Sequence, residues 1–126
     1  MNKNYTYGTT LLKINLESRI TVIGGDSGAG KSFLGKAWSK CSDDVIYVNY
    51  SNFVDVETLI FAIEKAVSGK IFILDNYDLY DSKSLVQSIK NSKASFLIFS
   101  RERKYIRELD YEFAKIEYTK GVIEIK

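Results

Sequence analysis

The chain has 126 residues, of which 45% are hydrophobic, enough for one core but not for two, so we expect a single domain over residues 1–126. Lys and Arg number 18 against 16 Asp and Glu, and a net charge of +2 leaves nucleic-acid binding unsupported. With no histidine and one cysteine, the chain lacks the residues for a zinc site, a histidine-based triad or an internal disulfide.

The sequence also indicates a compartment. The first ten residues, MNKNYTYGTT, contain no apolar signal-peptide core. No segment approaches the roughly 18 apolar residues that a membrane span requires. We therefore expect a cytoplasmic protein without a membrane span.

The predicted elements begin with a strand within residues 9–18, followed after a tight turn by a buried strand at residues 19–24. A glycine-rich segment then leads into a helix that starts at Lys31. Its apolar residues recur every three or four positions and predict one buried face, made of Phe33, Leu34, Ala37, Trp38 and Cys41.

The same alternation continues along the chain. We predict strands at 44–50, 70–75 and 95–99, and helices at 56–67, around 85–89 and at 105–109. Asp55 should cap the helix at 56–67 and Gly69 should end it. Strands that alternate with helices predict an α/β fold, in which a mainly parallel sheet is flanked by helices. The N-terminal strand, and a C-terminal hairpin at 113–126 that turns at 119–121, are predicted as antiparallel additions at the sheet edge.

The glycine-rich segment GDSGAGKS, residues 25–32, has the spacing G-x-x-x-x-G-K-[ST] between a predicted strand and a predicted helix. Glycines let the backbone N–H groups curl around a phosphate, and the helix N-terminus adds partial positive charge. Lys31 would reach the β- and γ-phosphates, and the Ser32 hydroxyl would join the Mg²⁺ shell. The predicted nucleotide-binding residues here are Gly25, Asp26, Ser27, Gly28, Ala29, Gly30, Lys31, Ser32 and Phe33.

A magnesium-bound phosphate also needs a carboxylate at the end of a neighbouring strand, and IFILD supplies Asp75. Together the two segments resemble the Walker A and Walker B elements of the P-loop NTPase superfamily. The resemblance implies a three-layer P-loop fold that binds ATP, or another nucleoside triphosphate, with Mg²⁺. Asp75 matches the magnesium aspartate of that family.

Within the superfamily, residues 11–126 look most like the ATP-binding core of ABC-type ATPases. The strand LLKINLES leads directly into the glycine-rich segment, and AKIEYTKGVIEIK resembles the closing hairpin of that family. The helical subdomain and an LSGGQ-like signature are missing, and Ser100 stands near the place of the family's switch histidine. ABC-like proteins stack adenine on an aromatic residue upstream of Walker A, a role that Tyr5 or Tyr7 could fill.

Hydrolysis depends on the residue after Asp75. Hydrolytic relatives usually have glutamate there, whereas this chain has Asn76, whose amide can hold a water molecule but cannot accept its proton. Asp78 is a candidate replacement base, although it and Asp81 could equally cap the following helix. Ser100 and Arg101 follow the fourth strand of the sheet, where they could sense the γ-phosphate or neutralise developing charge.

We therefore expect a minimal protein that binds Mg·ATP, hydrolyses it slowly at best and acts through a protein partner. Two alternatives remain. One is a small-molecule kinase with RERKYIR as its lid, and the other is a regulatory or inhibitory module with a structural nucleotide, which Asn76 favours.

Overall fold

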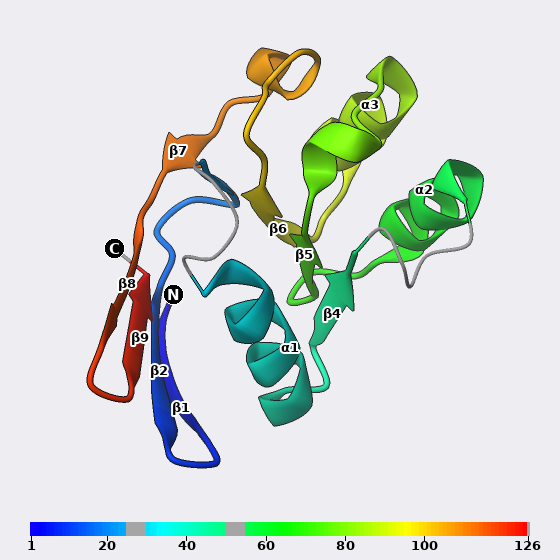
Figure 1. Ribbon diagram of the computed structural model, residues 1–126. Helices are drawn as coiled ribbons and strands as arrows, with labels where there is room; N and C mark the ends of the chain where they lie inside the picture. Colours follow the sequence, from blue (N-terminus) through cyan, green and yellow to red (C-terminus); the bar gives the residue numbers. More distant parts are fainter. Residues whose placement is uncertain (25–29, 50–54, 126) are drawn as a thin grey trace.

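The computed structural model describes residues 1–24, 30–49 and 55–125, which form an α/β fold with a mostly parallel sheet flanked by three helices (Figure 1). Within this part of the chain the parallel sheet has five strands in the order β4-β5-β6-β3-β7. They are β3 (Ile20–Ile23), β4 (Val45–Val48), β5 (Ile71–Leu74), β6 (Ser95–Phe99) and β7 (Glu112–Phe113).

Both faces of this sheet are covered. Along β5, Ile71 and Ile73 point into one hydrophobic cluster, while Phe72 and Leu74 point into the other. Helix α1 (Lys31–Cys41) covers the first face, and helices α2 (Val56–Lys65) and α3 (Lys83–Asn91) cover the second (Figure 1). The central strands β3, β5 and β6 are almost wholly apolar because both of their faces are buried.

Three of the four predicted helices are confirmed, with adjusted ends. Asp55 caps α2 as predicted, since its carboxylate accepts a hydrogen bond of 2.7 Å from the Thr58 N–H. This helix ends at Lys65, four residues before Gly69. Ser82 caps α3 instead of Asp81, whose carboxylate accepts from the Tyr105 N–H at 2.8 Å. On α1, Phe33 is exposed and Cys41 partly exposed, so the buried face is narrower than predicted.

The N- and C-terminal strands lie elsewhere than predicted. They form a separate four-stranded sheet among the described residues, in the order β1-β2-β9-β8. Its two hairpins are antiparallel, but β2 and β9 pair in parallel. The strands are β1 (Asn2–Tyr7), β2 (Thr10–Asn15), β8 (Ile116–Thr119) and β9 (Val122–Ile125).

The prediction of additions at the sheet edge was therefore wrong, and the apolar side chains explain why. Leu12 and Ile14 of β2, with Ile123 and Ile125 of β9, are buried in the same cluster as Trp38 of α1. Packing the second sheet against α1 buries them, which favours this arrangement.

Three short elements complete the described residues. The helix predicted at 105–109 is a single 3-10 turn, η2 (Ile106–Glu108), and another, η1 (Tyr77–Leu79), follows β5. Strand β7 has two residues and was not predicted. None of the helices in the described ranges has the length and apolar character needed to cross a bilayer.

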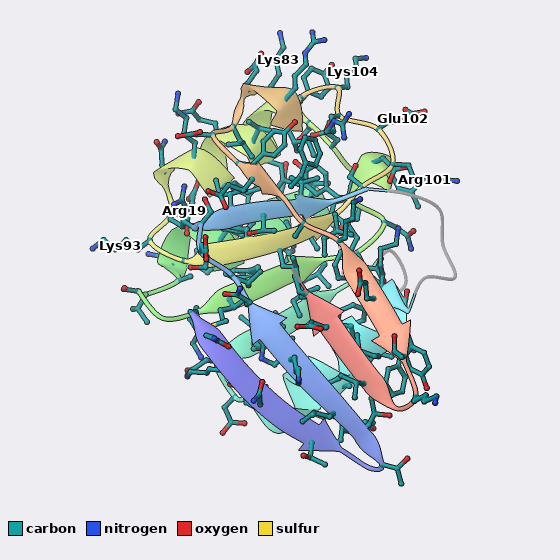
Figure 2. All side chains as sticks on the ribbon, turned by 90° about the vertical axis from the view of Figure 1, so that its left-hand side faces the viewer. Arg19, Lys83, Lys93, Arg101, Glu102 and Lys104 are labelled. Atoms are coloured by element: carbon teal, nitrogen blue, oxygen red, sulfur yellow. The ribbon has the colours of Figure 1, made fainter. Side chains whose placement is uncertain are left out.

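The two ends of the parallel strands carry different groups. Figure 2 shows Arg19 and Lys93 at the amino ends of β3 and β6, and Arg101 and Glu102 beyond the carboxyl end of β6. Arg19 stabilises the amino ends of β3 and β6, because its guanidinium donates hydrogen bonds to the carbonyls of Ile89, Ser92 and Ala94 at 2.9 to 3.1 Å. The predicted catalytic residues gather at the opposite end.

Candidate functional site

The carboxyl ends of β3, β5 and β6 meet at one edge of the parallel sheet. Asp75 was predicted to follow a strand that neighbours β3. It follows β5, and strand β6 lies between β3 and β5. Ser100, which follows β6, stands in the intervening position. The first turn of helix α1 nevertheless contacts Asp75 through Ser32, so the two predicted motifs meet.

The Asp75 carboxylate accepts three hydrogen bonds from the described residues at this edge, and its side chain is buried. Its Oδ2 accepts a hydrogen bond of 2.7 Å from Ser32 Oγ, which is 43 residues away in sequence. The same oxygen accepts a second bond of 2.5 Å from the Tyr47 hydroxyl. Oδ1 accepts from the backbone N–H of Asn76 at 2.9 Å. Asp75 therefore holds the start of α1, the end of β4 and its own turn together.

The backbone of Asp75 is fixed as well. Its N–H donates to the Val48 carbonyl at 2.8 Å, and its carbonyl accepts from the Tyr80 hydroxyl at 2.7 Å. Burial, followed by nearby negative charge, raises the pKa of Tyr80 above its ordinary value. Burial and the hydrogen bond to Asp75 raise the pKa of Tyr47. Both phenols therefore remain protonated donors at neutral pH, and neither was found by sequence reasoning.

Lys31 occupies the first position of α1, next to Ser32. Its side chain is only 7% exposed, and its Nζ lies 3.5 Å from the Gly24 carbonyl at the end of β3. Gly30 precedes it with a φ of 84°, a left-handed conformation that glycine adopts without strain. The lysine side chain thus reaches back to the end of β3. The predicted residues Gly25, Asp26, Ser27, Gly28 and Ala29 lie outside the described residues.

A close approach between α1 and β4 positions Tyr47. A Cβ atom built on Gly35 would lie 2.4 Å from two carbons of the Tyr47 ring, closer than atoms can pack. Glycine at this position therefore lets the ring lie against the helix while its hydroxyl reaches Asp75. The sequence contains both residues but gives no sign that they meet.

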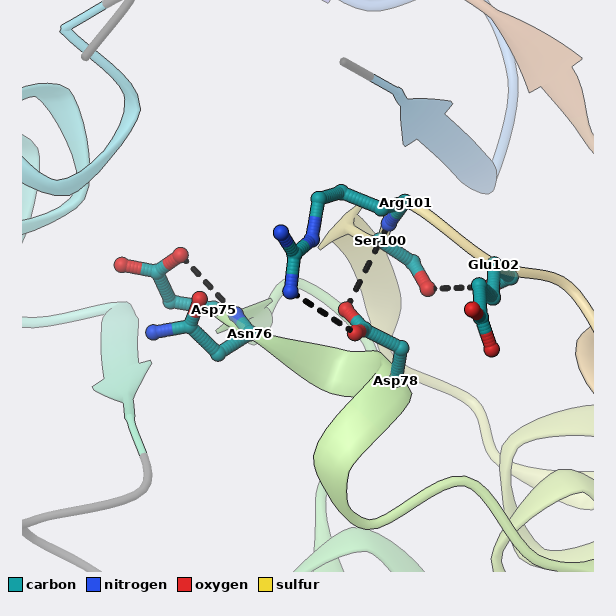
Figure 3. Close-up of polar contacts among 6 residues, drawn as sticks. All are labelled: Asp75, Asn76, Asp78, Ser100, Arg101 and Glu102. Carbon is teal, nitrogen blue, oxygen red and sulfur yellow. Dashed lines mark hydrogen bonds and ion pairs between the residues drawn. The ribbon is translucent and has the colours of Figure 1, made fainter. Parts of the chain in front are cut away.

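The turn after β6 is tied to the turn after β5 (Figure 3). Asp78 accepts a bond of 3.4 Å from the Arg101 N–H and lies 3.8 Å from its guanidinium. Ser100 is buried, and its hydroxyl donates to the Glu102 carbonyl at 2.5 Å. These contacts place Ser100 and Arg101 opposite Asp75 and Asn76.

One cavity of about 400 Å³ joins these groups. Its first wall comes from the start of α1 and consists of Gly30, Lys31, Ser32 and Phe33. Its second wall comes from the ends of β5 and β6 and includes Asp75, Asn76, Asp78, Ser100 and Arg101. The fold therefore gathers every predicted catalytic residue, and four of the predicted binding residues, around one space.

The aromatic residues proposed to stack on adenine lie outside this cavity. Tyr7 contacts Phe33 edge to face, with ring centroids 6.1 Å apart. Tyr5 packs on Trp38 at 6.3 Å and belongs to the margin of the hydrophobic cluster under the second sheet. Tyr7 is thus the better placed of the two, and its role stays a prediction.

The described residues contain no group of three or more acidic or cysteine side chains that could hold a metal ion by themselves. An ion at this edge would instead rely on Asp75, Ser32 and oxygens of its ligand. No family model matches the chain, and a search of curated proteins finds no match. The functional conclusion therefore rests on the site.

Proposed function

We propose that the protein binds a nucleoside triphosphate, expected to be ATP, with Mg²⁺, and that it hydrolyses the nucleotide slowly or only with the help of a protein partner. The observation that carries this proposal is the hydrogen bond from Ser32 at the start of α1 to the buried carboxylate of Asp75. Ser32 and Asp75, which are far apart in the sequence, line one polar cavity. Lys31 lines the same cavity, and its Nζ lies near the Gly24 carbonyl at the end of β3.

The donor set fits a magnesium ion. Mg²⁺ prefers oxygen ligands and is held in nucleotide sites by one or two side-chain oxygens together with phosphate oxygens and water. Ser32 Oγ and the Asp75 carboxylate would hold the ion. Bound Mg²⁺ would neutralise charge on the phosphates. The absence of a denser acidic cluster among the described residues agrees with a metal that arrives with its nucleotide.

The phosphates would be held by the start of α1. An α-helix N-terminus presents free backbone N–H groups and partial positive charge, and the first turn of α1 contains no acidic residue that would oppose an anion. The Lys31 ammonium lines the same cavity and adds a full positive charge. The resemblance of residues 25–32 to Walker A supports the same assignment.

We expect slow hydrolysis because of the two side chains, Asn76 and Asp78, that stand at the positions considered for a general base. Asn76 stands where a general base would be expected and cannot accept a proton. Asp78 is engaged by the N–H and the guanidinium of Arg101. A protein that retains its nucleotide can present a defined surface to a partner. Asn76 therefore also favours the second candidate function, a regulatory module with a long-lived nucleotide.

The proposal is tested by calorimetric titration of ATP into the wild type, Ser32→Ala and Ser39→Ala, each with Mg²⁺ and with EDTA. Ser39 lies on the same helix, and its hydroxyl donates to the Lys36 carbonyl, which makes it a matched control. We expect Ser32→Ala to weaken binding in Mg²⁺ and not in EDTA, while Ser39→Ala behaves as the wild type.

Equal behaviour of the two serine variants, or no binding of ATP by the wild type, would contradict the proposal. Incubation with Mg·ATP and candidate acceptors then separates slow hydrolysis, which yields ADP and phosphate, from a kinase, which yields a phosphorylated acceptor.

A further inference from the structure

A second cavity, of about 600 Å³, lies on the other side of Lys31. It is bounded by the end of β3 and by the chain that leaves β7. Lys31 lines both cavities, so the two spaces meet at this side chain. Most of the other lining residues are apolar or small, namely Ile23, Gly24, Phe113, Ala114 and Ile116.

The two cavities differ in chemistry and lie on opposite sides of β3. The polar cavity contains Asp75, which follows β5 beyond β6. The apolar cavity contains Phe113 of β7, the other neighbour of β3. A ligand that spans both would need a charged end for one and an apolar end for the other.

Phe113 has the surroundings of a stacking platform. Its side chain is 60% exposed although it lines a cavity. The Arg103 guanidinium lies 4.7 Å from the centre of its ring, and Tyr111 supports the ring edge to face at 5.1 Å. Aromatic rings and planar guanidinium groups are the side chains on which nucleobases stack.

We propose that this apolar cavity binds the base of the nucleotide, with Phe113 and Arg103 as its stacking residues. The inference rests on the function proposed above, because the phosphates would occupy the polar cavity. Lys31 marks the passage between the phosphates and the remainder of the ligand. The Tyr7–Phe33 pair is the competing platform, but Tyr7 lines neither cavity.

The test separates the base from the phosphates by comparing Mg·ATP with magnesium tripolyphosphate, which has no base. Calorimetric titrations are made with the wild type, Phe113→Ala, Arg103→Ala and Phe61→Ala. Phe61 of α2 is the matched control, because it is 61% exposed and a lysine ammonium, that of Lys65, lies 5.5 Å from its ring.

We expect the wild type to bind Mg·ATP more tightly than magnesium tripolyphosphate. Phe113→Ala should weaken ATP binding by about 5- to 150-fold, the range typical of a lost base–aromatic stack. Arg103→Ala should weaken it in the same direction. Neither variant should change tripolyphosphate binding, and Phe61→Ala should change neither ligand.

Two results would overturn the inference while leaving the proposed function intact. Both ligands could bind the wild type equally, or ATP binding could survive Phe113→Ala and Arg103→Ala but be weakened by Tyr7→Ala. A wild type that binds neither ligand would refute the proposed function and this inference together.

Discussion

The contact between Gly35 and Tyr47 makes Gly35→Ala an informative substitution. Alanine in a helix interior is normally more stable than glycine by about 1 kcal/mol. Here the new methyl group would lie 2.4 Å from the Tyr47 ring, so the ring must move. Moving it strains the packing between α1 and β4 and breaks the hydrogen bond from the Tyr47 hydroxyl to Asp75.

The expected magnitude follows from these opposing effects. Overpacking costs about 1 to 3 kcal/mol. For the lost hydrogen bond we use about 1.5 kcal/mol, the lower end of the range for bonds to charged groups, because the Tyr47 phenol is only half-buried. After the gain in helix propensity is subtracted, Gly35→Ala should lower the free energy of unfolding by about 1.5 to 3.5 kcal/mol. In a Tyr47→Val background the same change should stabilise by up to about 1 kcal/mol, because the ring is gone and the next atom, Ile73 Cγ2, is 3.4 Å away.

Urea denaturation of the four proteins in this cycle measures the effect. Trp38 is the single tryptophan and is fully buried, so its fluorescence reports unfolding without signal from a second tryptophan. The decisive result is the reversal of sign between the two backgrounds. If Gly35→Ala stabilises the protein while Tyr47 is present, the ring does not lie against α1 as described.

Three further predictions concern metal binding, catalysis and the stability of the fold. Asp75→Ala should remove the Mg²⁺ dependence of ATP binding, and an equal effect of EDTA on variant and wild type would show that Asp75 does not hold the ion. Asn76→Asp should raise phosphate release at least about tenfold by supplying a base. Aspartate is chosen because Asn76 has a φ of 51°, which it tolerates better than glutamate does. Unchanged release, together with loss of activity in Asp78→Asn, would assign the base to Asp78. Arg19→Gln should lower unfolding free energy by about 1.5 to 3 kcal/mol without changing nucleotide affinity, because its carbonyl partners lie at the opposite end of the sheet. A changed affinity would contradict that separation.

Much of the parallel sheet could be predicted from sequence because its signals are local. Apolar runs such as Ile71–Leu74 end at a polar residue, and helical repeats follow Gly30 and the capping residues Asp55 and Ser82. These patterns also placed Lys31, Ser32 and Asp75 at strand and helix ends, from which their convergence in one cavity follows.

Features that depend on long-range packing could not be predicted. The apolar alternation of Leu12 and Ile14 shows that one face of β2 is buried but not which surface covers it, so the second sheet was misplaced. Strand β1 is polar and largely exposed, and only its pairing with β2 defines it. Tyr47 and Tyr80 act through contacts across neighbouring elements, which no spacing along the chain reveals.

The central claim is that Lys31 at the start of α1 binds the phosphates of Mg·ATP. Its most direct test is a calorimetric titration of Mg·ATP into the wild type, Lys31→Ala and Lys36→Ala. Lys36 is exposed on the same helix and lines neither cavity, so it controls for the loss of a positive charge. Unfolding followed by Trp38 fluorescence verifies that each protein is folded.

We predict that Lys31→Ala weakens binding by about 10- to 150-fold, which corresponds to the roughly 1.5 to 3 kcal/mol of a charge-assisted contact. Lys36→Ala should bind as the wild type does. Equal affinity of the two variants, or a wild type that does not bind Mg·ATP, would contradict the account.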